Sequence, residues 1–207
     1  MRTAPGLGYQ ISTFKGAFMK KWIFILGFLS FAVLSALTHA YAWDALKTDQ
    51  FTVFYEPLYR DKAVRILSAL EYYKHIPERI VGNRCGSLPI VLDDYGQYMN
   101  GFANPVYYNI HLINYETADA DWLSYVAVHE YTHMAHMTMA GGLPGVFTFL
   151  FGNLAGPMLF APQWTFEAIT VYNESGLSAY MGRLNDGAFE TYMSICSAAG
   201  EFPSLMK

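Results

Sequence analysis

The residues best suited to chemistry lie together in one short segment, His-Glu-Tyr-Thr-His at positions 129–133. His129 and His133 are four positions apart in a helical pattern, so both imidazoles leave the same helix face and can reach one zinc ion at about 2.0–2.1 Å. Glu130 lies beside them, where it can act as general base toward a water molecule that such an ion activates. The alternative is a pair of core histidines that have this spacing by coincidence.

A catalytic zinc site takes three protein ligands and keeps a fourth position open, so another element must supply a further donor. Glu167 is the best candidate, because it follows 30 residues without Asp, Glu, Lys or Arg and begins a new helical pattern. It could also be an ordinary surface glutamate. His136 shares the helix face of the two histidines, but it lies about 10 Å of helix rise from His129 and is too distant to join the same ion.

The elements that position these residues begin with a predicted strand, helix and strand. Phe51–Tyr55 alternates, is β-branched or aromatic, and stops near a proline, so we expect a strand there. Asp61 is expected to cap a helix that ends or bends at Pro77. Leu88–Leu92 is expected to form a second, short apolar strand. The expected apolar face of the helix comprises Val64, Leu67, Leu70 and Tyr73.

A further strand is predicted over Val106–Ile113, where apolar and polar residues alternate. Pro105 can donate no ladder hydrogen bond, so this strand is expected near a sheet edge. Such an edge can bind an extended peptide or can lack a ligand, and the sequence leaves both readings open. The candidate substrate strand leading into it comprises Asn100, Gly101, Phe102 and Ala103. The helix that carries the two histidines is predicted to run from Asp119 or Asp121 to about Thr138.

The composition describes one domain with a sizeable core: 207 residues, 53% hydrophobic, with a net charge of −4. The negative charge and the absence of a basic stripe argue against nucleic acid as a partner. From Met19 the chain has two lysines, an apolar run of 16 residues (22–37) and Ala-Tyr-Ala, which predicts a secretory signal peptide over 19–42. An uncleaved membrane anchor is the alternative, although a span needs roughly 20 residues.

Residues 1–18 are then interpreted as an upstream extension from a start site chosen too early. In either case, residues 43–207 are expected to lie outside the cytoplasm, as an exported domain.

The segment 164–174, together with the histidine motif, resembles the gluzincins, the thermolysin-like and aminopeptidase-like zinc peptidases. The residues that carry this resemblance are Trp164, Glu167, Thr170, Val171, Tyr172 and Glu174. The resemblance implies that Glu167 is the third zinc ligand and that Glu174 orients a ligand histidine. An oxyanion donor is also expected, with Tyr172, Tyr180 and His136 as unranked candidates.

The chain departs from the gluzincin pattern in several places. Ala168 stands where the family usually has glycine, and the 33 residues between His133 and Glu167 exceed the spacer of thermolysin and the aminopeptidases. This longer connection is more similar to bacterial peptidase MA-like domains. The aminopeptidase Gly-Ala-Met-Glu-Asn motif is missing, which leaves endo or exo cleavage open. Metzincins are excluded, because His136 and Met139 occupy their glycine and third-histidine positions.

The uncharged segment 143–161 is expected to form an apolar loop or short helix that covers the cleft or contacts a membrane or partner. A membrane span is the alternative. A last helix is predicted over Ala188–Ala199. Cys85 and Cys196 are the only cysteines, and an exported setting permits either a disulfide or two separate thiols.

The expected fold class is α+β, zincin-like: a small mixed sheet with an edge strand over the histidine helix, followed by a mostly helical part. The expected function is an extracytoplasmic zinc-dependent peptidase that acts on peptides or proteins, with Zn²⁺ as cofactor. One alternative is a non-catalytic module that binds zinc or a partner, since only 40 residues follow Glu167. The other is a membrane-embedded metalloprotein with a span at 143–161.

Overall fold

The computed structural model describes residues 43–94, 100–114, 122–139, 141–156, 161–180 and 182–201. In these ranges the chain is α+β, with five strands in one mixed sheet and six α-helices. Residues from Trp43 onward form one compact unit. The expected signal peptide at 19–42 and the upstream extension at 1–18 lie outside the described residues.

The sheet has the strand order β1-β2-β3-β5-β4. Its central pairs, β2 with β3 and β3 with β5, are parallel, whereas β1 and β4 pair antiparallel at the two edges. The strands are β1 (Asp44–Lys47), β2 (Phe51–Tyr55), β3 (Leu88–Asp93), β4 (Gly101–Asn104) and β5 (Asn109–Ile113). The strands predicted over 51–55 and 88–92 are therefore confirmed.

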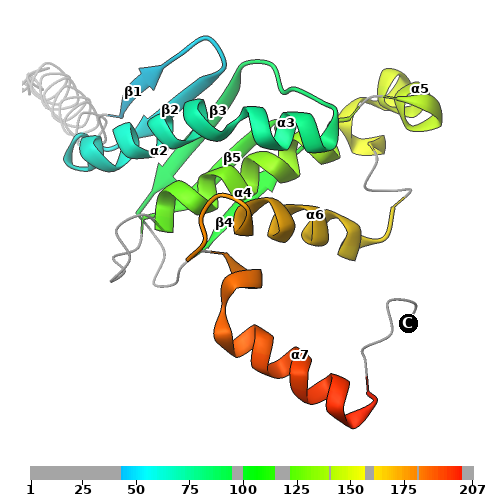
Figure 1. Ribbon diagram of the computed structural model, residues 1–207. Coiled ribbons are helices and arrows are strands. Elements are labelled where there is room, and N and C mark those ends of the chain that lie inside the picture. Colours follow the sequence, from blue (N-terminus) through cyan, green and yellow to red (C-terminus); the bar gives the residue numbers. More distant parts are fainter. Residues whose placement is uncertain are drawn as a thin grey trace, which may run out of the picture. The chain divides into compact units, whose positions relative to one another are not determined.

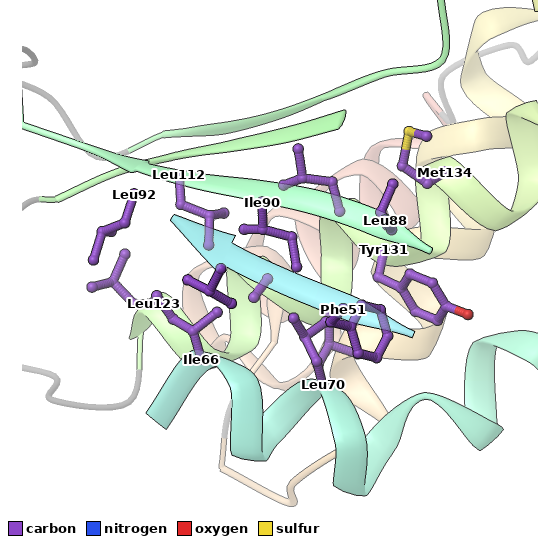
Figure 2. Close-up of a cluster of buried hydrophobic side chains, with 14 of the residues drawn as sticks. Phe51, Ile66, Leu70, Leu88, Ile90, Leu92, Leu112, Leu123, Tyr131 and Met134 are labelled. Atoms are coloured by element: carbon purple, nitrogen blue, oxygen red, sulfur yellow. The ribbon is translucent and has the colours of Figure 1, made fainter. Parts of the chain in front are cut away.

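The core lies on one face of this sheet, as the period-two alternation of its strands requires. Val53 pairs with Ile90, and Ile90 with Ile110, so these three fully buried side chains form one row across the parallel strands. Helices α2 (Arg60–Tyr73), α3 (His75–Val81) and α4 (Trp122–Met137) cover this face (Figure 1). Figure 2 shows the strand side chains directed toward side chains of these helices, among them Leu70 and Tyr131.

The predicted strand over 106–113 is wrong in its first half, because the chain turns at 105–108 before β5 begins at Asn109. Asn104 stabilises this turn, since its Oδ1 accepts from the backbone N–H groups of Val106 and Tyr107 at 3.1 Å. Tyr108 completes the reversal with a φ of 55°. The edge position expected for this strand belongs instead to β4, so the candidate substrate strand Asn100–Ala103 supplies the sheet edge.

Helix α2 presents a different face from the predicted one. Ala63, Ile66 and Leu70 are fully buried, whereas Val64 is 38% exposed. Both sets have helical spacing, and the small Ala63 lets the helix approach the sheet, so packing rather than periodicity selects the face. Leu67 and Tyr73 pack only partly buried against the core. Asp61 is not the cap either, because the helix begins one residue earlier, at Arg60.

The helix bends where Pro77 predicts, with α2 ending at Tyr73 and α3 starting at His75. Pro77 lies in the first turn of α3, where a backbone N–H has no intrahelical partner to lose. At this end of the core, Tyr131 on α4 donates to Glu78 at 2.6 Å, and Gln50 donates to Glu78 and to Tyr131 at 2.7 and 2.6 Å. This polar network joins α3, α4 and the start of β2.

The C-terminal part is helical, as expected, with α5 (Gly142–Phe151), α6 (Gln163–Ser175) and α7 (Gly187–Ala199). Asp186 caps α7 through a 2.9 Å bond from the N–H of Ala188, which confirms the predicted last helix. The segment expected as a loop or short helix contains α5, whose Phe149 is 88% exposed. Cys85 and Cys196 are both free thiols, the first of them buried.

In the part of the chain that the structure describes, no single helix has the length and apolarity to cross a membrane. Only α4 taken together with Gly142–Leu154 reaches that length and composition, and this pair is bent by 92°.

The two possible faces of α2 differ in what a truncation should cost. We expect Ile66→Ala to lower the free energy of unfolding by about 2–5 kcal/mol, since it opens a cavity in the core. Val64→Ala, two positions away on the same helix, should cost roughly 0.5 kcal/mol or less, because its side chain is exposed. Urea denaturation of both variants measures the difference. A larger loss for Val64→Ala than for Ile66→Ala would contradict the packing of α2.

Candidate metal centre

Helices α4 and α6 pack side by side and bring three metal-ligand side chains together. His133 Nε2 lies 3.4 Å from Glu167 Oε1, and His129 Nε2 lies 4.0 Å from Glu167 Oε2. One ligand atom from each residue falls within 4.8 Å of the other two, so this group could hold a metal ion. The sequence placed these residues 33 positions apart, and the fold closes that distance by packing α6 against α4.

The remaining ring nitrogens fix which tautomer each histidine presents. His129 Nδ1 lies 2.6 Å from Glu174 Oε2, a carboxylate oxygen that only accepts, so Nδ1 carries the proton. His133 Nδ1 lies 3.2 Å from Thr170 Oγ1, whose own proton goes to the carbonyl of Phe166. Both rings therefore keep an unprotonated Nε2 facing Glu167, which is the state that a metal ligand requires.

The spacing of residues on α6 explains this arrangement. Glu167, Thr170 and Glu174 recur at positions i, i+3 and i+7, so all three project from the helix face that meets α4. Asn173 on the same helix donates to Thr132 on α4 at 2.6 Å and locks the two helices in register. The second position of a ligand pair and its supporting groups thus come from one short helix.

Glu130 lies on the opposite side of α4 from this polar seam, against the sheet edge. Its carboxylate accepts a hydrogen bond from the backbone N–H of Ala103 in β4. A Cβ at Gly101 would approach its Cγ to 3.1 Å, so only glycine leaves room for Glu130 there. Burial raises the pKa of Glu130 to about 7, outweighing the lowering effect of His129.

Burial, together with the positive charge that His129 and Arg183 can carry, lowers the pKa of His133 to about 3. Its imidazole is thus neutral at pH 7 and free to coordinate. Although burial acts in the opposite direction, hydrogen bonds from His129 and Arg183 hold the pKa of Glu174 below its ordinary value. Glu174 consequently stays ionised.

Arg183, to which the sequence assigned no role, also reaches this centre. It opens the short helix η4 (Arg183–Asn185), and its Nε donates to Glu174 Oε1 at 3.0 Å. Its Nη2 lies 3.3 Å from His129 Nε2. The available signal was that Arg183 is the only charged residue between Glu174 and Asp186, but only the folded turn shows where it points.

These residues line a cavity of about 1340 Å³, together with Asn100, Gly101, Phe102 and Ala103 of the sheet edge. Of the three candidate oxyanion donors, Tyr180 also lines it. Tyr172 is 64% exposed and lies outside the cavity lining. His136 lies outside the lining as well, with its ring 4.5 Å from that of Phe166. The fold therefore gathers the ligand, base and sheet-edge candidates, but only one of the donor candidates.

Comparison of the chain with protein-family models, with curated proteins and with solved structures finds no match. The likeness to gluzincins thus remains a resemblance over the two patches that carry it.

The geometry predicts the metal content of the protein. After loading with zinc and gel filtration, the wild type should retain about one ion per chain, and Glu167→Ala should lose most of it, because one of three protein ligands is gone. Glu190→Ala on α7, which removes an exposed glutamate away from the cavity, is the matched control and should keep its ion. Full retention by Glu167→Ala would exclude Glu167 as a ligand.

The support of His129 by Glu174 predicts a smaller, graded effect. Glu174→Gln keeps the shape of the side chain but removes the charge that orients and polarises the ring, so zinc affinity should fall about 10–100-fold. Competition with a chromophoric chelator measures this change. An unchanged affinity would show that the 2.6 Å contact between His129 and Glu174 does not support the metal.

Proposed function

We propose that this chain is a zinc-dependent peptidase in which His129, His133 and Glu167 hold the ion and Glu130 acts as general base. The observation that carries the proposal is the convergence of the three donors within 4.8 Å, with Glu130 lining the same cavity. Two imidazole nitrogens and one carboxylate oxygen, with a further position open, form a donor set typical of catalytic zinc. The zincin-like fold and the exported location remain parts of this proposal.

When bound, the zinc ion would supply Lewis-acid chemistry, polarising the scissile carbonyl and making a water molecule more acidic. Glu130 takes the proton of the attacking water and passes it to the leaving amine. A carboxyl group with a pKa of about 7 suits both steps near neutral pH, because it exchanges a proton readily in either direction. The hydrogen bond from Ala103 holds this carboxylate toward the cavity.

The sheet edge at β4 supports a polypeptide as substrate. The N–H of Ile113 donates to the carbonyl of Asn100 at 3.0 Å, which sets the antiparallel register of β4 on β5. The peptide groups of Gly101 and Ala103 then point away from β5, toward the outer edge. Because this edge lines the same cavity as the metal ligands, an extended peptide that pairs with it would pass alongside Glu130.

The proposal predicts activity that depends on one carboxylate. The zinc-loaded chain should hydrolyse members of an unbiased peptide mixture, with cleavage detected by mass spectrometry. Glu130→Gln should lower kcat by about 10²–10⁴-fold while keeping one zinc per chain, because it removes the base without removing a ligand. Zinc binding without hydrolysis of any peptide would instead support the non-catalytic module.

A further inference from the structure

Arg183 is the only lysine or arginine among the described residues that line the cavity. Its guanidinium faces the metal-ligand atoms, with Nη2 3.3 Å from His129 Nε2 and Nη1 3.9 Å from Glu167 Oε2. A cation so close to two ligands is of no use for attracting a metal ion, since like charges repel. Its position therefore asks for a negatively charged group other than the ligands.

Arg183 is held in this position through both its backbone and its side chain. Glu174 Oε1 accepts from the Nε of Arg183 at 3.0 Å and from its backbone N–H at 3.1 Å, while Oε2 serves His129. One buried carboxylate thus fixes a ligand ring and the arginine together. Such a charge-assisted pair is stronger than a neutral hydrogen bond, and it orients the planar guanidinium.

The backbone leading into Arg183 is equally constrained. Gly182 has a φ of 92°, and a Cβ there would lie 2.5 Å from the Cα of Ser175, so only glycine permits this turn. The N–H of Leu184 donates to Ser175 Oγ at 3.0 Å on the other side of Arg183. The turn is pinned to the end of α6, the helix that also carries Glu167.

With Nε bonded to Glu174, the two Nη groups form the edge of Arg183 that is directed into the centre. We propose that this edge makes Arg183 a catalytic residue, which donates hydrogen bonds to the negatively charged oxygen that develops on the scissile carbonyl. A fixed cation aimed at the point where charge develops is an effective way to stabilise that transition state. The inference rests on the proposed peptidase function and adds the residue that this function lacked.

Arg183 fits this role better than the tyrosine and histidine candidates. Tyr180 lines the cavity but is 91% exposed, and Tyr172 and His136 lie outside the lining. None of the three carries a fixed positive charge at pH 7, since the pKa of His136 is lowered by burial. Arg183 alone combines a permanent charge with contacts to the residues of the centre.

The test compares zinc-loaded wild type with Arg183→Met, Arg183→Lys and the control Arg60→Met, whose arginine is exposed on α2. Arg183→Met should lower kcat about 10²–10³-fold with KM within about threefold, equally for peptides with free and amidated C-termini, and should keep its zinc. Arg183→Lys should recover part of kcat, because a cation remains. Arg60→Met should match the wild type.

A readout without turnover uses calorimetry of a peptide phosphonate, whose charged oxygens imitate the tetrahedral intermediate. In the Glu130→Gln background, Arg183→Met should weaken phosphonate binding about 10²–10³-fold, in parallel with kcat. If Arg183→Met does not fold, Arg183→Lys decides the question: it should keep zinc and show a kcat and a phosphonate affinity roughly tenfold or more below the wild type.

Several results would overturn the proposal. A kcat within threefold of the wild type in Arg183→Met, or a fully wild-type Arg183→Lys, would show that the reaction does not use this cation. Loss of zinc from a folded Arg183→Met would assign the residue to holding Glu174 alone. An effect on KM confined to free C-termini would assign it to the terminal carboxylate of the substrate. If the wild type cleaves no peptide, the proposed function itself fails, and this inference falls with it.

Discussion

The hydrogen bond between Glu174 on α6 and His129 on α4 is the contact on which the centre depends. It is short, at 2.6 Å, and largely buried, and it leaves Nε2 of the ring facing Glu167. The second oxygen of Glu174 holds Arg183, so one carboxylate orders groups from two helices and a turn. Removing a partner from a buried charged pair costs far more than an exposed pair would, which makes α6 and α4 a single unit around this bond.

The sheet supplies the second constraint, because it presents Glu130 from the opposite side. The parallel strands β2, β3 and β5 bury one face under α2 and α4, and this packing fixes how α4 rotates about its axis. Glu130 then meets the β4 edge, where the N–H of Ala103 receives its carboxylate. The same helix thus carries the ligand histidines toward α6 and the base toward the sheet edge, as adjacent positions about 100° apart on a helix allow.

Local pattern was sufficient for the elements with strong periodicity or a chemical motif. The strands at 51–55 and 88–92, helix α4 and helix α7 could be predicted because each is long or regular enough to show its period. Strand β4 was missed, since glycine and asparagine at its ends disfavour a strand and only pairing with β5 stabilises it. The buried face of α2 and the position of Arg183 depend on tertiary packing: two faces had similar periodicity, and a turn at Gly182 delivers the arginine.

The most direct test of this account is X-ray absorption spectroscopy of the zinc-loaded protein at the zinc edge. The account predicts nitrogen and oxygen neighbours at about 2.0–2.1 Å, with outer-shell scattering from two imidazoles that falls to one imidazole in His133→Ala. Sulfur scattering at about 2.3 Å would place the metal at a cysteine instead. An imidazole signal unchanged in His133→Ala would equally contradict the assignment of His129, His133 and Glu167 as the metal ligands.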